Sequence, residues 1–313
     1  MSAAPTSRIV GLDIARALAI IGMIVVHLGS LVWSTKITLL GVPSAMFAVI
    51  AGITMMIIGR NYSLTTLLRL FTRGALIALI GLALLPFAGD IHVVLVVMGL
   101  AMIITAWVPA ISLPWKLLAF VIVTAYSVYT FVSAPGPQIY PLAAWCAYFI
   151  AGMILYDVYI KIAKPALSWL LTAVSAMFAI IGLYLRTIHE VPVWLKFNGH
   201  TGALGEILLS VAITAVVLHL CILLSNSQAG ILTKPFAAMG TMSLTTYILH
   251  ILTAAYWQEH IAIQSNLATF GFIIAFLAFA TLWARFIGQG PVEKLVSTLI
   301  KFIVPSAAKP AHA

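Results

Sequence analysis

Charged side chains are scarce in this chain of 313 residues, of which Asp, Glu, Lys and Arg together make up 7%. Ordinary soluble domains carry about a quarter charged residues, so the composition excludes that class. Hydrophobic residues make up 63% of the chain, and the mean hydropathy is +1.16. We therefore interpret the chain as an all-α, polytopic integral membrane protein.

Cysteine and nucleotide-binding motifs are equally scarce. The two cysteines, Cys146 and Cys221, both fall in apolar runs and lack metal-ligand spacing, so we expect neither a disulfide framework nor a metal site. The chain has no glycine-rich phosphate loop. It also has no matching pair of broken helices in its two halves, which is the sequence hint of an inverted-repeat transporter.

Long apolar runs are what the sequence has in abundance. About ten of them are long enough to cross some 30 Å of hydrocarbon. The expected spans are residues 11–33, 42–59, 70–88, 92–110, 115–132, 141–160, 167–186, 202–224, 236–257 and 266–287. Gly and Ala are frequent within residues 45–52 and 143–152, and such small residues let helices pack closely in a membrane.

The positions of Lys and Arg predict the orientation, because cytoplasmic loops carry the excess of both. With ten spans, one side has three cations: Lys36, Arg186 and Lys196. The other side has twelve: Arg8, Arg60, Arg69, Arg73, Lys116, Lys161, Lys164, Lys234, Arg285, Lys294, Lys301 and Lys309. Both termini are therefore predicted to be cytoplasmic. This topology accounts for the net charge of +9 without a nucleic-acid partner.

The chain reads as one membrane domain over residues 1–290, with no soluble extension. Asp13 and Arg16 interrupt the first apolar run, so we interpret it as a retained span rather than a cleaved signal peptide. Residues 291–313 are predicted to form a short cytoplasmic amphipathic helix, anchored at the membrane interface, and a disordered tail. The sequence leaves open whether the chain forms a homo-oligomer.

Three ionisable residues in the first span need a reason. An uncompensated charge at bilayer depth costs about 3 kcal/mol or more and usually faces the bundle interior or a wet cavity. Asp13 and Arg16 are three residues apart and share a helix face. His27 lies eleven residues beyond Arg16, about three turns and roughly 16 Å along the axis. One helix is thus predicted to present Asp, Arg and His along one stripe.

The run from Leu12 to His27, in which Asp13, Arg16 and His27 stand at fixed spacing, resembles the signature of acyltransferase family 3 and of the membrane proteins grouped around heparan-α-glucosaminide N-acetyltransferase. Looser matches extend over most of the chain. They are residues 47–54, 89–92, 141–152, 240–247 and 290–293. The resemblance implies a bacterial inner-membrane acyltransferase. Such an enzyme takes an acyl group, usually acetyl, from cytoplasmic acyl-CoA and delivers it to a hydroxyl or amine of an extracytoplasmic glycan or glycolipid.

The chemistry gives the polar residues their expected roles. Acyl transfer from a thioester needs a base or an acyl carrier, and imidazole can be either. We expect His27 to play this part, because it lies in the outer half of the first span. Asp90, Glu206 and His250 are expected near it, since a carboxylate can orient a histidine. His92 is a further candidate, whereas His189, Glu190, His200, Glu259 and His260 are expected to be interfacial residues in contact with water.

Cationic residues supply the expected donor site. Arg16, held by Asp13, is predicted to face the CoA phosphates. Arg60, Arg69 and Arg73 surround one short loop and could bind the same phosphates by charge-assisted hydrogen bonds. A second function stays open, namely a proton-coupled transporter or flippase for a small solute or lipid-linked intermediate. In that case Asp13, Arg16, His27, Glu206 and His250 would form the proton path.

Overall fold

The computed structural model describes residues 8–134, 139–187, 190–261 and 264–305. Within these residues every regular element is a helix. The α-helices are α1 (Val10–Leu28), α2 (Trp33–Leu39), α3 (Val42–Ile58), α4 (Leu64–Leu84), α5 (Leu95–Ile104), α6 (Leu113–Ser133), α7 (Leu142–Tyr156), α8 (Pro165–Thr187), α9 (Leu204–Ser225), α10 (Lys234–Thr241), α11 (Ser243–His260), α12 (Asn266–Phe286) and α13 (Pro291–Ile303). His189 lies outside the described residues.

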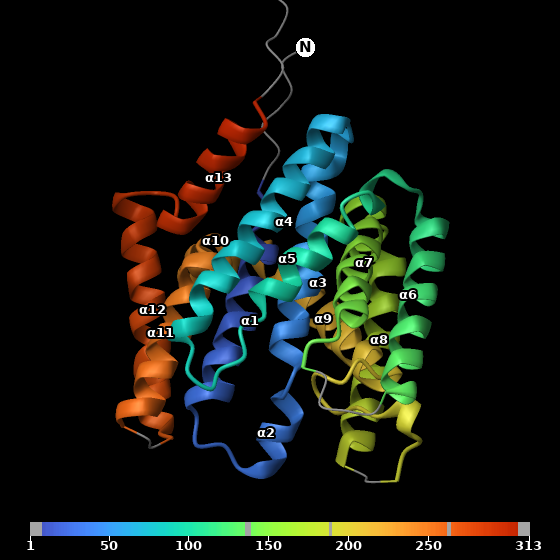
Figure 1. Ribbon diagram of the computed structural model, residues 1–313, viewed down its shortest axis with the longest axis horizontal. Helices are drawn as coiled ribbons and strands as arrows, with labels where there is room; N and C mark the ends of the chain where they lie inside the picture. Colours follow the sequence, from blue (N-terminus) through green and yellow to red (C-terminus); the bar gives the residue numbers. More distant parts are fainter. Residues whose placement is uncertain (1–7, 135–138, 188–189, 262–263, 306–313) are drawn as a thin grey trace, which may run out of the picture.

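The described residues contain eight helical runs that are long and apolar enough to cross a membrane. The bent pair formed by Gln228–Thr241 and Ser243–His260 adds a ninth, and α5 is a shorter apolar helix. The chain is therefore a polytopic integral membrane protein, as the composition predicted. The start of α1 and the whole of α13 lie at the same end of the bundle (Figure 1).

Four of the expected spans differ from the structure, and the third begins at Leu64, six residues before its predicted start. The fourth, predicted at 92–110, contains only the ten-residue α5, about 15 Å long, followed by a 3₁₀ turn at Val108–Ala110. The ninth, predicted as one span at 236–257, is bent by 77° between α10 and α11. The first ends at Leu28 instead of residue 33, because the chain turns extended at Gly29 before α2 begins.

The core of the bundle lies around α3 and α7, whereas α6 and α12 are largely exposed on the outside. A side chain at Gly52 would collide with the backbone of Phe149, and one at Gly152 would collide with the backbone of Val49. The two helix backbones therefore touch at these glycines. Close helix packing at these small residues agrees with the expectation, and the structure adds that α3 and α7 are the partners.

Glycine also accounts for the position of the bent element. Gly240 lies in α10 against the backbone of Asp13 in α1, so closely that a Cβ atom would overlap it. The chain then breaks at Met242, and α11 starts in a new direction. The first-span motif and the break in the ninth span are therefore neighbours.

Candidate functional site

The charges of α1 form one connected group. The Arg16 Nη1 atom lies 2.6 Å from Oδ1 of Asp13, and the Arg8 Nε atom lies 2.6 Å from its Oδ2. The second Arg16 terminal nitrogen donates to the hydroxyl of Thr54 in α3 at 2.6 Å. Asp13 is buried and uses both of its oxygens on arginines. The three-residue spacing thus fixes the Arg16 guanidinium toward α3.

A cavity of about 150 Å³ adjoins this group. Arg16 and Thr54 line it together with Arg73 of α4, Ser243 at the start of α11 and Glu293 of α13. Within the described residues, Arg73 has neither a hydrogen bond nor an ion pair. We call this space the inner cavity. Its charged lining consists of Arg73, of Arg16, which is already paired with Asp13, and of the Glu293 carboxylate.

The other expected donor-site arginines are placed elsewhere. Arg60 donates to the hydroxyl of Tyr156 at 2.9 Å. Neither Arg60 nor Arg69 is among the residues that line the inner cavity. Of the three arginines around the α3–α4 loop, the structure therefore brings only Arg73 to Arg16.

A larger cavity of about 600 Å³ opens toward the opposite end of the bundle, where α1 ends. We call it the outer cavity. Its polar lining comes from six segments far apart in the sequence. The residues are His27, Lys36, Ser44, Asp90, His92, Tyr140, His200, Thr201, Tyr247, His250, Gln258 and Gln264. The structure thus brings together His27, Asp90 and His250, which the sequence singled out.

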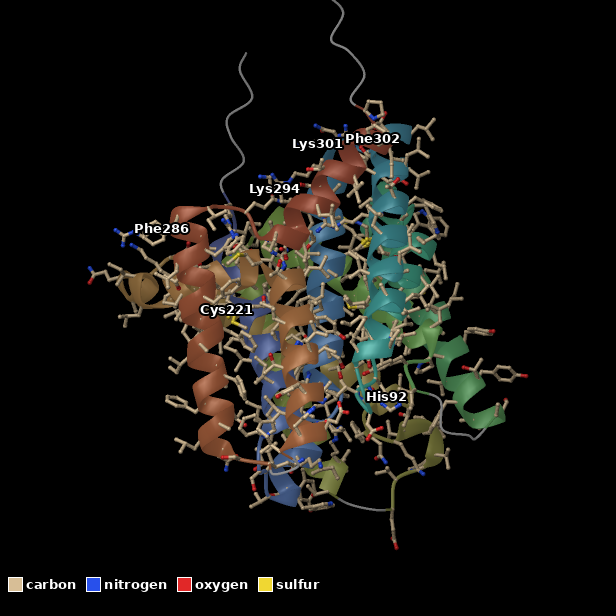
Figure 2. The ribbon with its side chains drawn as sticks, turned by 60° about the vertical axis from the view of Figure 1, so that its left-hand side comes forward. His92, Cys221, Phe286, Lys294, Lys301 and Phe302 are labelled. Atoms are coloured by element: carbon tan, nitrogen blue, oxygen red, sulfur yellow. The ribbon has the colours of Figure 1, made fainter. Side chains whose placement is uncertain are left out.

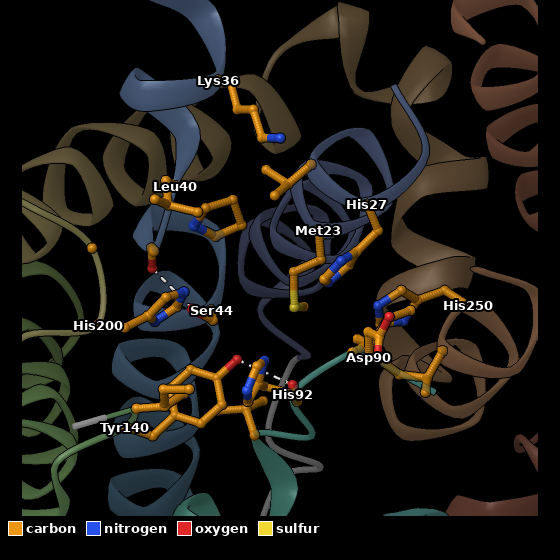
Figure 3. Close-up of a pocket in the computed structure, with 18 of the residues that line it drawn as sticks. Met23, His27, Lys36, Leu40, Ser44, Asp90, His92, Tyr140, His200 and His250 are labelled. Carbon is orange, nitrogen blue, oxygen red and sulfur yellow. Dashed lines mark hydrogen bonds between the residues drawn. The ribbon is translucent and has the colours of Figure 1, made fainter. Parts of the chain in front are cut away.

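His27 and His250 face each other across the outer cavity. Their ring centroids are 6.0 Å apart, and the planes are inclined by 30°. Figure 3 places both rings, with Asp90, on the side of the cavity opposite His200. His250 is only 1% exposed, and neither of its ring nitrogens has a hydrogen-bond partner within the described residues. Buried polar atoms are nearly always paired, so two unpaired nitrogens on one buried imidazole are an unusual feature of this wall.

The backbone around the two rings is fixed by long-range hydrogen bonds. The Gln258 side chain donates to the carbonyl of His27 at 3.1 Å, which joins the ends of α11 and α1. The ring of Tyr247 packs edge-on against His250, with centroids 4.9 Å apart. The Tyr247 hydroxyl in turn accepts the backbone N–H of Val94 at 3.1 Å. The two histidines therefore rest on rigid supports.

The opposite wall is built by Tyr140 and His200. Their rings meet edge-on with centroids 4.8 Å apart, and the Tyr140 hydroxyl donates to the carbonyl of His92 at 3.1 Å. Burial lowers the pKa of His200 to about 4, with Arg186, His92 and His27 contributing in the same direction. Burial raises the pKa of Tyr140 to about 12. This wall is therefore uncharged at neutral pH.

Glu206 lies behind that wall and is not among the residues that line the outer cavity. Its buried carboxylate accepts the backbone N–H groups of His200, Thr201 and Gly202, the last two at 2.7 and 2.8 Å. His200 and Gly202 both have positive φ angles, +68° and +76°. The carboxylate thus stabilises a strained turn that points His200 into the cavity.

Sequence reasoning missed several residues of the outer cavity. His200 was expected to be an interfacial residue, Lys36 was counted only as a loop cation, and Tyr140 and Tyr247 were given no role. Tyr140 directly precedes a span, as anchoring tyrosines often do, so nothing distinguished it. Two cations that had been counted as loop charges are buried in the structure. Lys116 is buried 2.6 Å from Asp157, and buried Arg186 donates to the carbonyls of Thr38 and Leu40.

The comparisons with known proteins bear on the second half of the chain. Residues 157–302 match a family described as "Protein of unknown function (DUF418)". The match covers Glu206, His250 and all but the last residue of α13, but not Arg16 or His27. No curated protein matches the chain. Within the described residues, no three His, Cys, Asp or Glu side chains are grouped so that they could hold a metal ion.

Proposed function

We propose that this protein is a membrane acyltransferase that moves an acyl group from acyl-CoA to a hydroxyl or amine acceptor. The observation that supports this most is the pairing of His27 with the unpartnered His250 in the outer cavity. The first helix carries His27 at one end and Arg16 in the inner cavity at the other. A cationic donor end and an imidazole acceptor end on one helix are what this reaction requires.

The donor would bind at the inner cavity. A phosphate of CoA would take charge-assisted hydrogen bonds from Arg73 and Arg16. The inner cavity of about 150 Å³ is small, so the rest of the nucleotide would lie outside it, at the end of the bundle. The arm that carries the thioester would then cover the roughly 16 Å along α1 between Arg16 and His27. The end of the bundle that holds the inner cavity would be the cytoplasmic side, as the excess of Lys and Arg predicts.

The transfer itself would take place in the outer cavity. An imidazole nitrogen of His27 or His250 removes the proton from the acceptor as its oxygen or nitrogen attacks the thioester carbonyl carbon. The carbon–sulfur bond then breaks, and the CoA thiolate takes up the proton from the imidazolium. The acceptor would reach the outer cavity from the extracytoplasmic side. A glycan or glycolipid fits the polar lining, which offers Lys36, Gln258 and Gln264 as donors.

Ligand-dependent stability of the purified protein tests the proposal. A ligand that binds only the folded state at 100 times its Kd adds about 2.7 kcal/mol to stability. We expect acetyl-CoA and CoA to raise the apparent melting temperature of the wild-type protein in detergent. Arg16→Ala and Arg73→Ala should lose this rise, whereas Arg60→Ala, with its cation outside the inner cavity, should keep it.

The histidine variants separate binding from chemistry. His27→Ala and His250→Ala should still be stabilised by acetyl-CoA, but release of CoA thiol in the presence of native membranes should fall by 100-fold or more. If neither ligand raises the melting temperature of the wild-type protein or of any variant, the donor site is refuted. Full activity of both histidine variants would refute their roles in the reaction.

The bend between α10 and α11 favours a second candidate, a proton-coupled transporter or flippase. Broken helices next to charged residues are common at transport sites, and Gly240 places this break against Asp13. His27 and His250 would then carry protons instead of transferring them to a thiolate. Proton uptake by liposomes that contain the protein, driven by a solute gradient and independent of acyl-CoA, would favour this candidate.

A further inference from the structure

The last helix, α13, lies across the end of the bundle at which α1 begins and packs against α4 and α11 (Figure 1). It follows a turn in which Gly288 has a φ of +99°. Val296 and Val304 are buried, so one face of α13 is fixed to the bundle. The opposite face of α13 has no cover from the described part of the chain.

That outward face combines apolar and cationic side chains. Leu295 and Phe302 are 55% and 84% exposed and lie seven residues apart, so they share one side of the helix. Lys294 and Lys301 form a parallel stripe beside them. Figure 2 shows both lysines and Phe302 projecting outward from α13.

The charge of this face is uncompensated. Neither Lys294 nor Lys301 makes an ion pair within the described residues. The only carboxylate of α13 belongs to Glu293, which accepts the backbone N–H groups of Leu244 and Thr245 at 2.6 and 3.1 Å and the Thr245 hydroxyl at 2.6 Å. The outward face therefore offers two free ammonium groups beside exposed apolar side chains.

We propose that this face of α13 is a binding site for anionic phospholipid. Leu295 and Phe302 would enter the boundary between headgroups and acyl chains, while Lys294 and Lys301 contact lipid phosphates, as amphipathic interfacial helices do. The location supports a lipid occupant, because α13 follows directly on α12, a helix long and apolar enough to span a membrane. This proposal does not rest on acyl transfer.

The site is connected to the interior through Glu293. Its carboxylate binds the first turn of α11, and His250 follows seven residues after the start of that helix. Glu293 also lines the inner cavity beside Arg16 and Arg73. Lipid that holds α13 in place therefore also holds the start of α11 and one wall of the inner cavity.

Lipid titration of the full-length protein tests the proposal. The protein in neutral detergent is titrated with short-chain phosphatidylglycerol and with phosphatidylcholine of the same chain length, and binding is followed by native mass spectrometry. We expect phosphatidylglycerol to bind at least 10-fold more tightly. Lys294→Gln/Lys301→Gln should lose about 30-fold in affinity, since a lysine near an anionic surface contributes about 1 kcal/mol. Added salt should weaken wild-type binding in the same way.

A matched variant controls for net charge. Lys164→Gln/Lys234→Gln removes two exposed cations outside α13 and should bind phosphatidylglycerol as the wild type does. Glu293→Gln should also retain the lipid, but lose the lipid-dependent protection of residues 243–246 from hydrogen exchange. Equal affinity for both lipids, or equal losses in the two double variants, would overturn the site. If lipid still protects residues 243–246 from hydrogen exchange in Glu293→Gln, the connection of the lipid site to α11 through Glu293 is overturned.

Discussion

Replacing Glu206 by Gln tests whether its carboxylate acts on substrate or only supports the wall of the outer cavity that Tyr140 and His200 form. The Oε2 atom of Glu206 accepts three hydrogen bonds, from Thr201 N, Thr201 Oγ1 and Gly202 N, and Oε1 accepts one from His200 N. Hydrogen bonds to charged groups contribute about 1.5–3 kcal/mol, and those to neutral groups about 0.5–1.5 kcal/mol. The amide can keep its oxygen at the Oε2 position, so three bonds would weaken by about 1 kcal/mol each.

The fourth bond would be lost outright. The amide nitrogen would face the N–H of His200 and leave that donor unpaired, at a cost of about 1–3 kcal/mol. Removing a buried charge recovers part of this summed loss in the free energy of unfolding. We therefore expect Glu206→Gln to lower the free energy of unfolding by about 3 kcal/mol. Because the bonds hold residues 200–202, hydrogen exchange there should rise more than in the rest of the bundle.

The assay compares Glu206→Gln with Glu190→Gln, which makes the same change of charge at an exposed position near the start of the same loop. Thermal unfolding in detergent and hydrogen exchange of residues 197–203 are measured for both. Glu190→Gln should stay within about 0.5 kcal/mol of the wild type. If Glu206→Gln is equally stable and its loop exchanges at the wild-type rate, the support role is refuted and a direct role in the reaction is favoured.

Three further predictions concern stability. Lys116→Met should destabilise the protein by about 3–5 kcal/mol, because it leaves the buried Asp157 carboxylate without its close partner. The double variant Lys116→Met/Asp157→Leu should recover most of that loss in thermal unfolding. Equal losses of stability in the single and double variants would contradict this. Gly152→Ala should cost about 1–3 kcal/mol by forcing α7 away from Val49, and Gly271→Ala, where nothing lies close, should serve as the neutral control. Since the pKa of His200 is about 4 in the folded state and 6.5 unfolded, the unfolded state binds the proton first. Stability should therefore fall as the pH drops from 6.5 to 4, and His200→Gln should show a smaller fall than the wild type in unfolding experiments across this range.

Much of the fold could be predicted because long apolar runs have few alternatives in a membrane. The spans around α3 and α7 followed from hydropathy, and small residues such as Gly52 and Gly152 predicted close packing, but not that these two helices are partners. The short α5 and the bend at Met242 could not be predicted, because an apolar composition fits a half-length or broken helix as well as a straight one. What decides them is contact with other helices, such as Gly240 against Asp13.

The candidate site divides in the same way. The spacing of Asp13, Arg16 and His27 on one helix is a local property, so the sequence predicted one stripe of polar groups. His250 and Asp90 were suspected because a carboxylate can orient a histidine, and Arg73 because it belongs to a group of arginines around one short loop. The sequence did not indicate that His200 and Tyr140 share a wall, since residues near a span end are polar or aromatic for many reasons.

The sequence by itself determined that this protein lies in a membrane and that its first helix carries an ion pair and a histidine about three turns apart. Periodicity and hydropathy are properties of consecutive residues, so both can be read from the sequence alone. The tertiary structure decided which groups meet. It brought His27 to His250, and it placed Arg16 and Arg73 in the lining of one cavity. It also buried Lys116 against Asp157 and placed Glu206 behind the wall formed by Tyr140 and His200. Long-range packing decides this, because it sets the distances between side chains on different helices.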